Sequence, residues 1–266
     1  MLDLDLGRFA EIMNRLIHIL RDLEERQSDQ KPLVAEERNN FIGFLLEVRQ
    51  FFAAYEIDVE GDTARAINKL QDTEGRIKDL LYPYTLALRN HINDELRKRK
   101  FMFIPSAEAE YYEHHGLFGQ EVAERFPKAN REITEAGNCY ATGNYTACVF
   151  HLMRAVEYGA RKLIHALHAQ QYLNPPNRPV ELCTWDDLLK AMDKGVADLA
   201  NGTRTNTRKK VTYEYYSHAV AQFRNFKNAW RNHVAHTREL YLPGQTKDIM
   251  DNTRQFMQHL ATRLTE

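Results

Sequence analysis

Cysteine is scarce in this sequence, and its three residues form no Cys-x-x-Cys pair. An odd number of thiols cannot all pair within one chain, and short zinc motifs use closely spaced cysteine pairs. The cysteine content therefore argues against a disulfide scaffold and a zinc knuckle, and it indicates a reducing compartment. We interpret Cys139 and Cys148 as buried thiols rather than nucleophiles, because their helical surroundings are apolar.

Long hydrophobic runs are also absent. No stretch approaches the roughly 20 apolar residues that a membrane-spanning helix needs, and the first residues, Met1–Asp5, are acidic where a secretory signal would be basic. The net charge is −1, from 36 basic and 37 acidic side chains, which by itself indicates neither a nucleic-acid binder nor an acidic tail. We expect a soluble, cytoplasmic protein that has no membrane partner.

Glycine and proline are few, with 12 and 8 residues among 266, and they divide the chain into helical lengths. Between them, apolar residues recur with a period of about 3.6, which predicts an all-α helical bundle. In the first half, we expect helices near 5–27, after Pro32, at 63–81 (ended by Pro83) and at 85–99. In the second half, we expect helices near 127–140, 145–169, 211–240 and 247–265, a short helix opened by the capping box Thr184–Asp187, and a loop at 198–207.

A hinge is expected at Phe101–Pro105, because Pro105 cannot continue the helix before it. This hinge separates an N-terminal α-helical region of unknown role, residues 1–104, from a second helical domain, residues 105–266, whose core is about 127–266.

Positive charge is concentrated in the second half. Between Gly202 and Arg238 there are eight basic residues against one acidic residue, Glu214, a local excess of seven positive charges. The basic residues are Arg204, Arg208, Lys209, Lys210, Arg224, Lys227, Arg231 and Arg238. Such a stretch can attract a polyanion through counterion release, but the charge alone is explained more simply by a solvated helix face and a basic loop.

The long helix in this stretch has two distinct faces on a wheel drawn at 100° per residue. The packed face is predicted to hold Tyr216, Val220, Phe223, Phe226, Trp230 and Val234. The opposite face is predicted to hold Glu214, His218, Asn225, Asn232 and His236. Tyr213, Tyr215 and Tyr216 are of a type that stacks on bases, but we expect them to pack between helices.

The segment Trp230–His236 contains the pattern Arg231-Asn232-x-x-x-His236 near the end of this helix. Upstream, Gly143-Asn-Tyr145 opens a helix that carries Ala147, His151, Arg154, Ala155 and Glu157. In both features the chain resembles the HEPN superfamily, named for higher eukaryote and prokaryote nucleotide-binding domains. The resemblance covers roughly residues 127–266 and leaves the first hundred residues unexplained.

The resemblance implies a HEPN-like helical bundle that forms a homodimer, with two such motifs lining one cleft. It also implies a metal-independent endoribonuclease, without a cofactor, of a toxin, antiphage defence or RNA-processing system. The RNA would be tRNA or mRNA, and an antitoxin or another defence-system component is a possible partner. Cleavage would use the 2′-hydroxyl as nucleophile and leave 2′,3′-cyclic phosphate and 5′-hydroxyl ends.

Each motif residue has a chemical role in that reaction. A histidine side chain is suited to proton transfer near neutral pH, and the resemblance implies that His236 would move the proton of the hydroxyl. Arg231 stabilises the charge that develops on the phosphorane, and Asn232 orients the phosphate or the imidazole. Glu157 holds Arg231 or His236 in place, unless it forms a plain intrahelical ion pair with Arg154. The predicted RNA-binding residues are basic: Arg154, His233, Arg224, Lys227, Arg238, Lys209 and Lys210.

Two observations separate this chain from related possibilities. Toxins of this superfamily that are regulated by nucleotidylation carry a tyrosine two residues after the motif histidine, where this chain has Arg238. The histidine pairs 165/168 and 233/236 lack a third ligand at zinc spacing, so no metal site is expected.

Two other functions remain open from the sequence. One is a non-catalytic helical module that binds RNA or a protein in a larger complex. The other is a purely structural dimer in which His236 packs at the two-fold axis.

Overall fold

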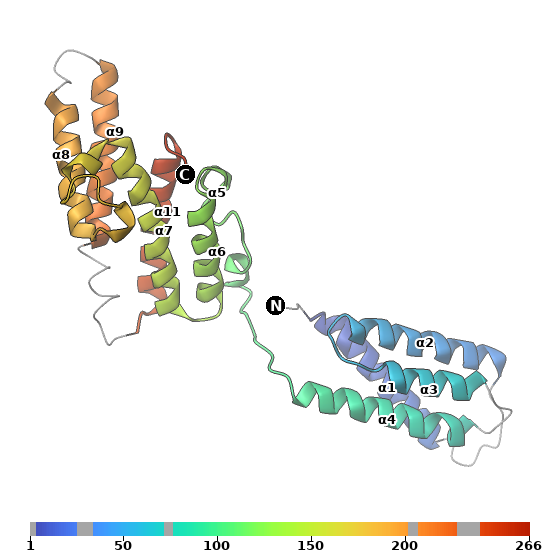
Figure 1. Ribbon diagram of the computed structural model, residues 1–266. Helices are drawn as coiled ribbons and strands as arrows, with labels where there is room; N and C mark the ends of the chain where they lie inside the picture. The colour runs from blue at the N-terminus through green and yellow to red at the C-terminus, as the bar shows by residue number, and fades with distance from the viewer. Residues whose placement is uncertain (1–3, 26–33, 72–76, 202–206, 228–239) are drawn as a thin grey trace. The chain divides into compact units, whose positions relative to one another are not determined.

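The computed structural model describes residues 4–25, 34–71, 77–201, 207–227 and 240–266 (Figure 1). All regular structure within these ranges is helical, and they contain no strand, so the all-α prediction is confirmed. The chain divides into two compact units, Met1–Phe101 and Met102–Glu266, each of which has its own hydrophobic core. The two units are described separately.

The first unit contains four α-helices among its described residues: α1 (Leu6–Glu25), α2 (Ala35–Ala53), α3 (Glu60–Gln71) and α4 (Ile77–Arg97). Helix α4 packs against α1 and α3, and α2 packs against α3. Apolar residues of α1 that recur with the helical period face the core: Leu16, Leu20 and Leu23 are buried, and Phe9 and Met13 are partly buried. The stripe of α2 is also buried from Phe41 to Phe52.

Pro83 does not end a helix, as the sequence predicted, but lies inside α4. Proline lacks the N–H that would bond four residues back, which costs about 3 kcal/mol in a helix interior. On either side of it, Leu81, Thr85, Leu88 and Ile92 are buried, whereas Pro83 itself is exposed. The continuous burial of this stripe compensates for the lost hydrogen bond.

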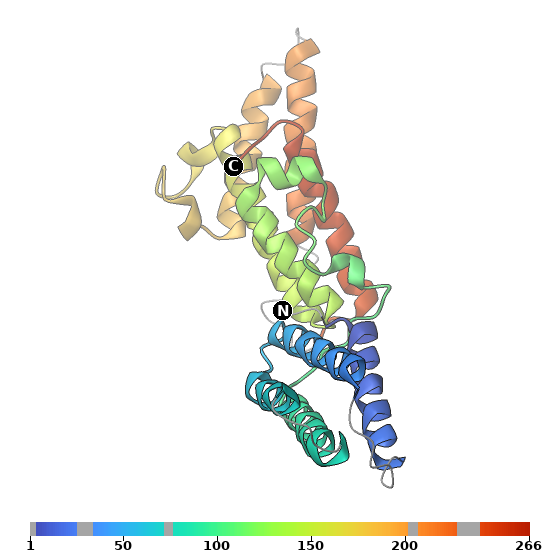
Figure 2. The same ribbon diagram turned by 90° about the vertical axis from the view of Figure 1, so that its right-hand side faces the viewer.

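The second unit is also a helical bundle (Figure 2). Its α-helices in the described ranges are α5 (Gln120–Arg125), α6 (Pro127–Ala141), α7 (Tyr145–Ala166), α8 (Trp185–Asn201), α9 (Thr207–Phe226) and α11 (Pro243–Ala261). Three short 3₁₀ turns accompany them: η2 (Ala109–Tyr111), η3 (Ala169–Tyr172) and η4 (Val180–Leu182). Helix α7 packs against α6, α8, α9 and α11, and is therefore the central helix of this unit.

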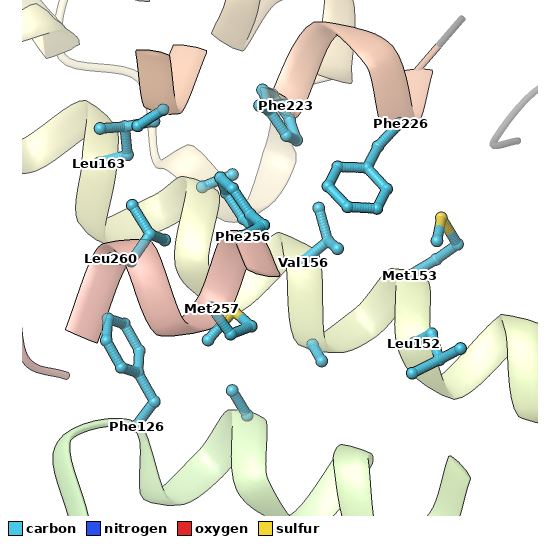
Figure 3. Packing of buried hydrophobic residues seen from close by; sticks show 14 of the residues in the cluster. Phe126, Leu152, Met153, Val156, Leu163, Phe223, Phe226, Phe256, Met257 and Leu260 are labelled. Carbon is cyan, nitrogen blue, oxygen red and sulfur yellow. The ribbon is translucent and has the colours of Figure 1, made fainter. Parts of the chain in front are cut away.

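Phenylalanine side chains of α9 and α11 and a valine of α7 meet in the core of this unit (Figure 3). Phe223 and Phe226 of α9 lie 6.5 and 5.5 Å, centroid to centroid, from Phe256 of α11. Val156 of α7 is fully buried in the same cluster. The predicted packed face of α9 is therefore confirmed at Val220, Phe223 and Phe226, which are buried, whereas Tyr216 is only half-buried.

The start of α8 matches the predicted capping box. The Thr184 hydroxyl accepts a hydrogen bond from Asp187 N at 3.2 Å, and the Asp187 carboxylate accepts one from Thr184 N at 3.1 Å. The loop predicted at 198–207 is wrong in its first part, because α8 continues to Asn201. Val196 and Leu199 extend the apolar stripe and pack against the core, which stabilises the extra turn.

Candidate nucleic-acid interface of the second unit

The residues that carry the predicted catalysis, Arg231, Asn232 and His236, lie outside the described residues, as do the predicted RNA contacts His233 and Arg238. The described chain before them ends at Lys227, directly after the last residue of α9, and the chain after them resumes at Leu240. Tyr241 N donates a 3.2 Å hydrogen bond to Thr146 Oγ1 in the first turn of α7. The residues that flank the motif are therefore attached to α8, through Lys227, and to α7, through Tyr241.

Glu157 lies near the middle of α7, and its carboxylate accepts a 2.8 Å hydrogen bond from the indole N–H of Trp185. Trp185 is only 2 % exposed, and a buried indole N–H needs such an acceptor. The Trp185 ring also lies 4.8 Å from the Phe223 ring of α9. Glu157 thus binds the start of α8, next to the helix that leads into the motif. Its expected contact with Arg231 or His236 stays a prediction.

Arg154 pairs with another helix rather than with Glu157. Its Nη2 lies 2.8 Å from Glu132 Oε1 of α6, and the other carboxylate oxygen lies 2.8 Å from His151 Nδ1. The hydrogen bond to Glu132 raises the pKa of Arg154. Glu132 is only 13 % exposed, so one largely buried carboxylate holds both Arg154 and His151 in this turn of α7.

Two basic side chains of the stretch between Gly202 and Arg238 pair with acidic residues that lie outside it in the sequence. Arg224 forms an ion pair with Asp193, and Lys227 forms one with Asp186, both on α8. Lys210 lies 3.9 Å from Glu214 on its own helix, whereas Lys209 is exposed. The pairs of Arg224 and Lys210 are exposed, and exposed ion pairs contribute only about 0–1 kcal/mol each.

Tyr215 packs between helices, as expected. Its hydroxyl donates a 3.0 Å hydrogen bond to the Leu260 carbonyl of α11, and its ring stacks on His259 with the centroids 4.5 Å apart. Burial raises the pKa of Tyr215 to about 12. The neighbouring Tyr216 is half-buried against the same core. These two rings stabilise the bundle and are not accessible for stacking on nucleic-acid bases.

The thiols of this unit are poorly suited to nucleophilic chemistry. Cys148 is fully buried, and burial raises its pKa well above the usual range of a thiol. Cys139 is only half-buried, so its predicted burial is partial, and burial raises its pKa too. In the ranges that the structure describes, no three His, Cys, Asp or Glu side chains gather as a metal site would require.

None of the helices in the described ranges combines the length and the apolar character that crossing a membrane requires.

Glu132 and Phe150 lie next to Arg154 and His151 of α7. Neither residue was identified from the sequence alone. Glu132 gave no signal, because its partners lie on another helix. Phe150 gave one: it directly follows Val149, which belongs to the apolar stripe of α7, and therefore falls outside the helical period of that stripe.

Comparisons with known proteins add no assignment. No protein-family model matches the chain, and no curated protein and no solved structure matches it.

Proposed function

We propose that this chain is a metal-independent endoribonuclease that acts on tRNA or mRNA in the cytoplasm. The observation that carries the proposal is the pattern Arg231-Asn232-x-x-x-His236, which follows α9 directly in the sequence. The described turns of α9 bury Phe223 and expose His218, as the wheel predicts. The same wheel assigns Asn232 and His236 to the polar face.

The proposed chemistry requires three groups. His236 removes the proton from the RNA 2′-hydroxyl, and the resulting oxygen attacks the adjacent phosphorus. The new bond joins the 2′-oxygen to phosphorus while the bond from phosphorus to the 5′-oxygen breaks, and the leaving oxygen takes up a proton. Arg231 offers forked donors to the charge that develops on the phosphorane. The products are a 2′,3′-cyclic phosphate and a 5′-hydroxyl.

Described side chains support this proposal from the other helices. Glu157 lies beside Trp185 and α9, where it would orient Arg231 or His236. Arg154 is held beside His151 on the exposed side of α7, and Arg224, Lys227, Lys209 and Lys210 supply positive charge along α9. We propose that two copies of the chain form the active dimer, and that an antitoxin or another defence-system component regulates it.

The test is cleavage of bulk tRNA and mRNA in EDTA by the full chain. We expect the unaltered protein to leave cyclic phosphate ends, and we expect His236→Ala and Arg231→Ala each to abolish this activity. His218→Ala is the matched control, because His218 is exposed on the same helix and outside the motif. If both motif variants cleave like the unaltered protein, the mechanism is wrong. Salt-sensitive RNA binding without strand scission would instead identify a non-catalytic binding module.

A further inference from the structure

A large aromatic side chain lies exposed on the outer face of α7. Phe150 has 52 % of its surface accessible, although its neighbours Val149 and Met153 are buried in the core. Burying a phenylalanine stabilises a fold by about 1.5–3 kcal/mol, and Phe150 gives up much of that gain. An exposed ring of this size on a central helix is available to a partner.

The side chains of His151 and Arg154 flank the Phe150 ring on its own helix. The ring of His151 lies edge-on to it, with the centroids 5.9 Å apart, and the Arg154 guanidinium carbon lies 6.0 Å from its centroid. The Glu132 carboxylate lies 2.8 Å from both side chains. Because these side chains are already restrained, a ligand that contacts them loses little additional conformational entropy.

The same combination recurs farther along the helix. Tyr158 lies one turn after Arg154, and the Arg161 guanidinium carbon lies 5.4 Å from the centroid of the Tyr158 ring. Arg161 forms no ion pair within the described part of the chain. At 100° per residue, Phe150, Arg154, Tyr158 and Arg161 fall within about 80° of one another. These four residues, which we call the α7 stripe, extend over about 16 Å of the helix.

We infer that the α7 stripe binds single-stranded RNA, with a base stacked on Phe150 and phosphates contacted by Arg154 and Arg161. Alternating aromatic and basic side chains are how proteins hold single strands without reading a sequence. A duplex keeps its bases stacked on each other and offers none to an exposed ring. This inference rests on the proposed function, because it assumes that RNA is the substrate, and it adds the strandedness of that substrate and a surface that holds it.

The test measures binding separately from cleavage. A fluorescent oligouridylate of about 12 nucleotides is titrated with the full chain in EDTA, in the His236→Ala background so that the probe stays intact. We expect Phe150→Ala to weaken binding by about 5- to 150-fold, the equivalent of the ~1–3 kcal/mol that stacking of one base contributes. Phe150→Trp should retain binding. Arg161→Gln should reduce the salt dependence by about 0.7 in the slope of log affinity against log salt.

The control is Leu182→Ala, which removes another exposed apolar side chain of the same unit, 63 % accessible in η4, and should leave affinity unchanged. Because Phe150 is exposed, its truncation leaves no cavity in the core, and circular dichroism checks that the variant folds. An unchanged affinity of Phe150→Ala, or no binding by its parent, overturns the inference. A shift in sedimentation with unchanged RNA affinity would assign the surface to a second copy of the chain and also overturns it.

The two proposals fail separately. If RNA binding depends on Phe150 but RNA stays intact after incubation with the unaltered protein, the proposed ribonuclease activity is refuted, and RNA binding by the α7 stripe stands. If cleavage depends on His236 but Phe150→Ala binds RNA with wild-type affinity, the α7 stripe does not bind RNA, and the proposed ribonuclease activity stands.

Discussion

The indole N–H of Trp185 donates a hydrogen bond of 2.8 Å to the Glu157 carboxylate, which joins the first residue of α8 to the middle of α7. The indole is almost fully buried and also packs on Phe223 of α9. Trp185 therefore links α8 to α7 by a hydrogen bond and to α9 by ring packing. Glu157 has a structural role whatever its role in catalysis.

Substitutions of this pair separate the two roles. We expect Trp185→Phe to lower the free energy of unfolding by about 1.5–3 kcal/mol, because it deletes a buried donor to a charged acceptor. Glu157→Gln keeps an oxygen acceptor and should cost about 0.5–1.5 kcal/mol. If Glu157 orients the motif, Glu157→Gln nevertheless reduces RNA cleavage at least about tenfold. Urea unfolding followed by circular dichroism and cleavage assays measure the two effects, and equal stability losses would contradict the assignment.

Gly137 allows α6 to approach the turn around Tyr111. A Cβ at this position would lie 2.4 Å from the Tyr111 carbonyl oxygen and 3.1 Å from Leu117 Cδ2. Because a backbone atom cannot rotate away, we expect Gly137→Ala to destabilise the second unit by about 1–3 kcal/mol or more. Gly244→Ala is the control, since no atom lies within 4 Å of its Cβ. It should be neutral or slightly stabilising. Both tryptophans lie in this unit, so fluorescence reports its unfolding specifically.

Pro83 should be a site of easily gained stability in the first unit. We expect Pro83→Ala to stabilise α4 by about 1–3 kcal/mol, because it restores a backbone donor in an exposed helix interior and only partly increases the freedom of the unfolded chain. Ala87→Gly, also exposed on α4, should have the opposite sign by about 1 kcal/mol. Native-state hydrogen exchange of α4 amides measures both. Equal or lower protection in Pro83→Ala would show that packing requires the proline.

His259 should make the second unit sensitive to mild acid. Burial lowers the pKa of His259, the hydrogen bond to the Tyr215 carbonyl partly opposes this, and the charges of His218 and Arg263 lower it further. The unfolded chain therefore binds a proton at higher pH than the folded chain, so stability falls as the pH drops below about 6.5. His259→Gln should flatten this dependence in thermal melts taken between pH values of about 7.5 and 5.5.

His218→Gln is the matched control for that measurement, because His218 faces His259 at a ring distance of 4.7 Å but is exposed. We expect it to keep most of the pH dependence. If the pH dependence of stability disappears in His218→Gln and persists in His259→Gln, His218 takes up the proton and the prediction for His259 is wrong.

Much of the fold follows from local sequence. The stripe from Val149 to Leu167 is buried as its period predicts, and Thr184 caps α8, because both depend on residues within one or two helical turns. The helix ends predicted at Pro83 and near residue 198 are wrong. Local propensity favoured a helix end at both places, but burial of the surrounding apolar residues against other helices outweighed it.

The sequence by itself determined the helical class, the apolar faces of the helices and the resemblance that motivates Arg231 and His236 as catalytic residues. Only the tertiary structure decided the partners of the charged residues. Glu132 holds Arg154 and His151 from another helix, and α8 supplies the carboxylates beside Arg224 and Lys227. A charge interacts with whatever folding brings within a few ångströms, and sequence spacing gives that distance only inside a single helix.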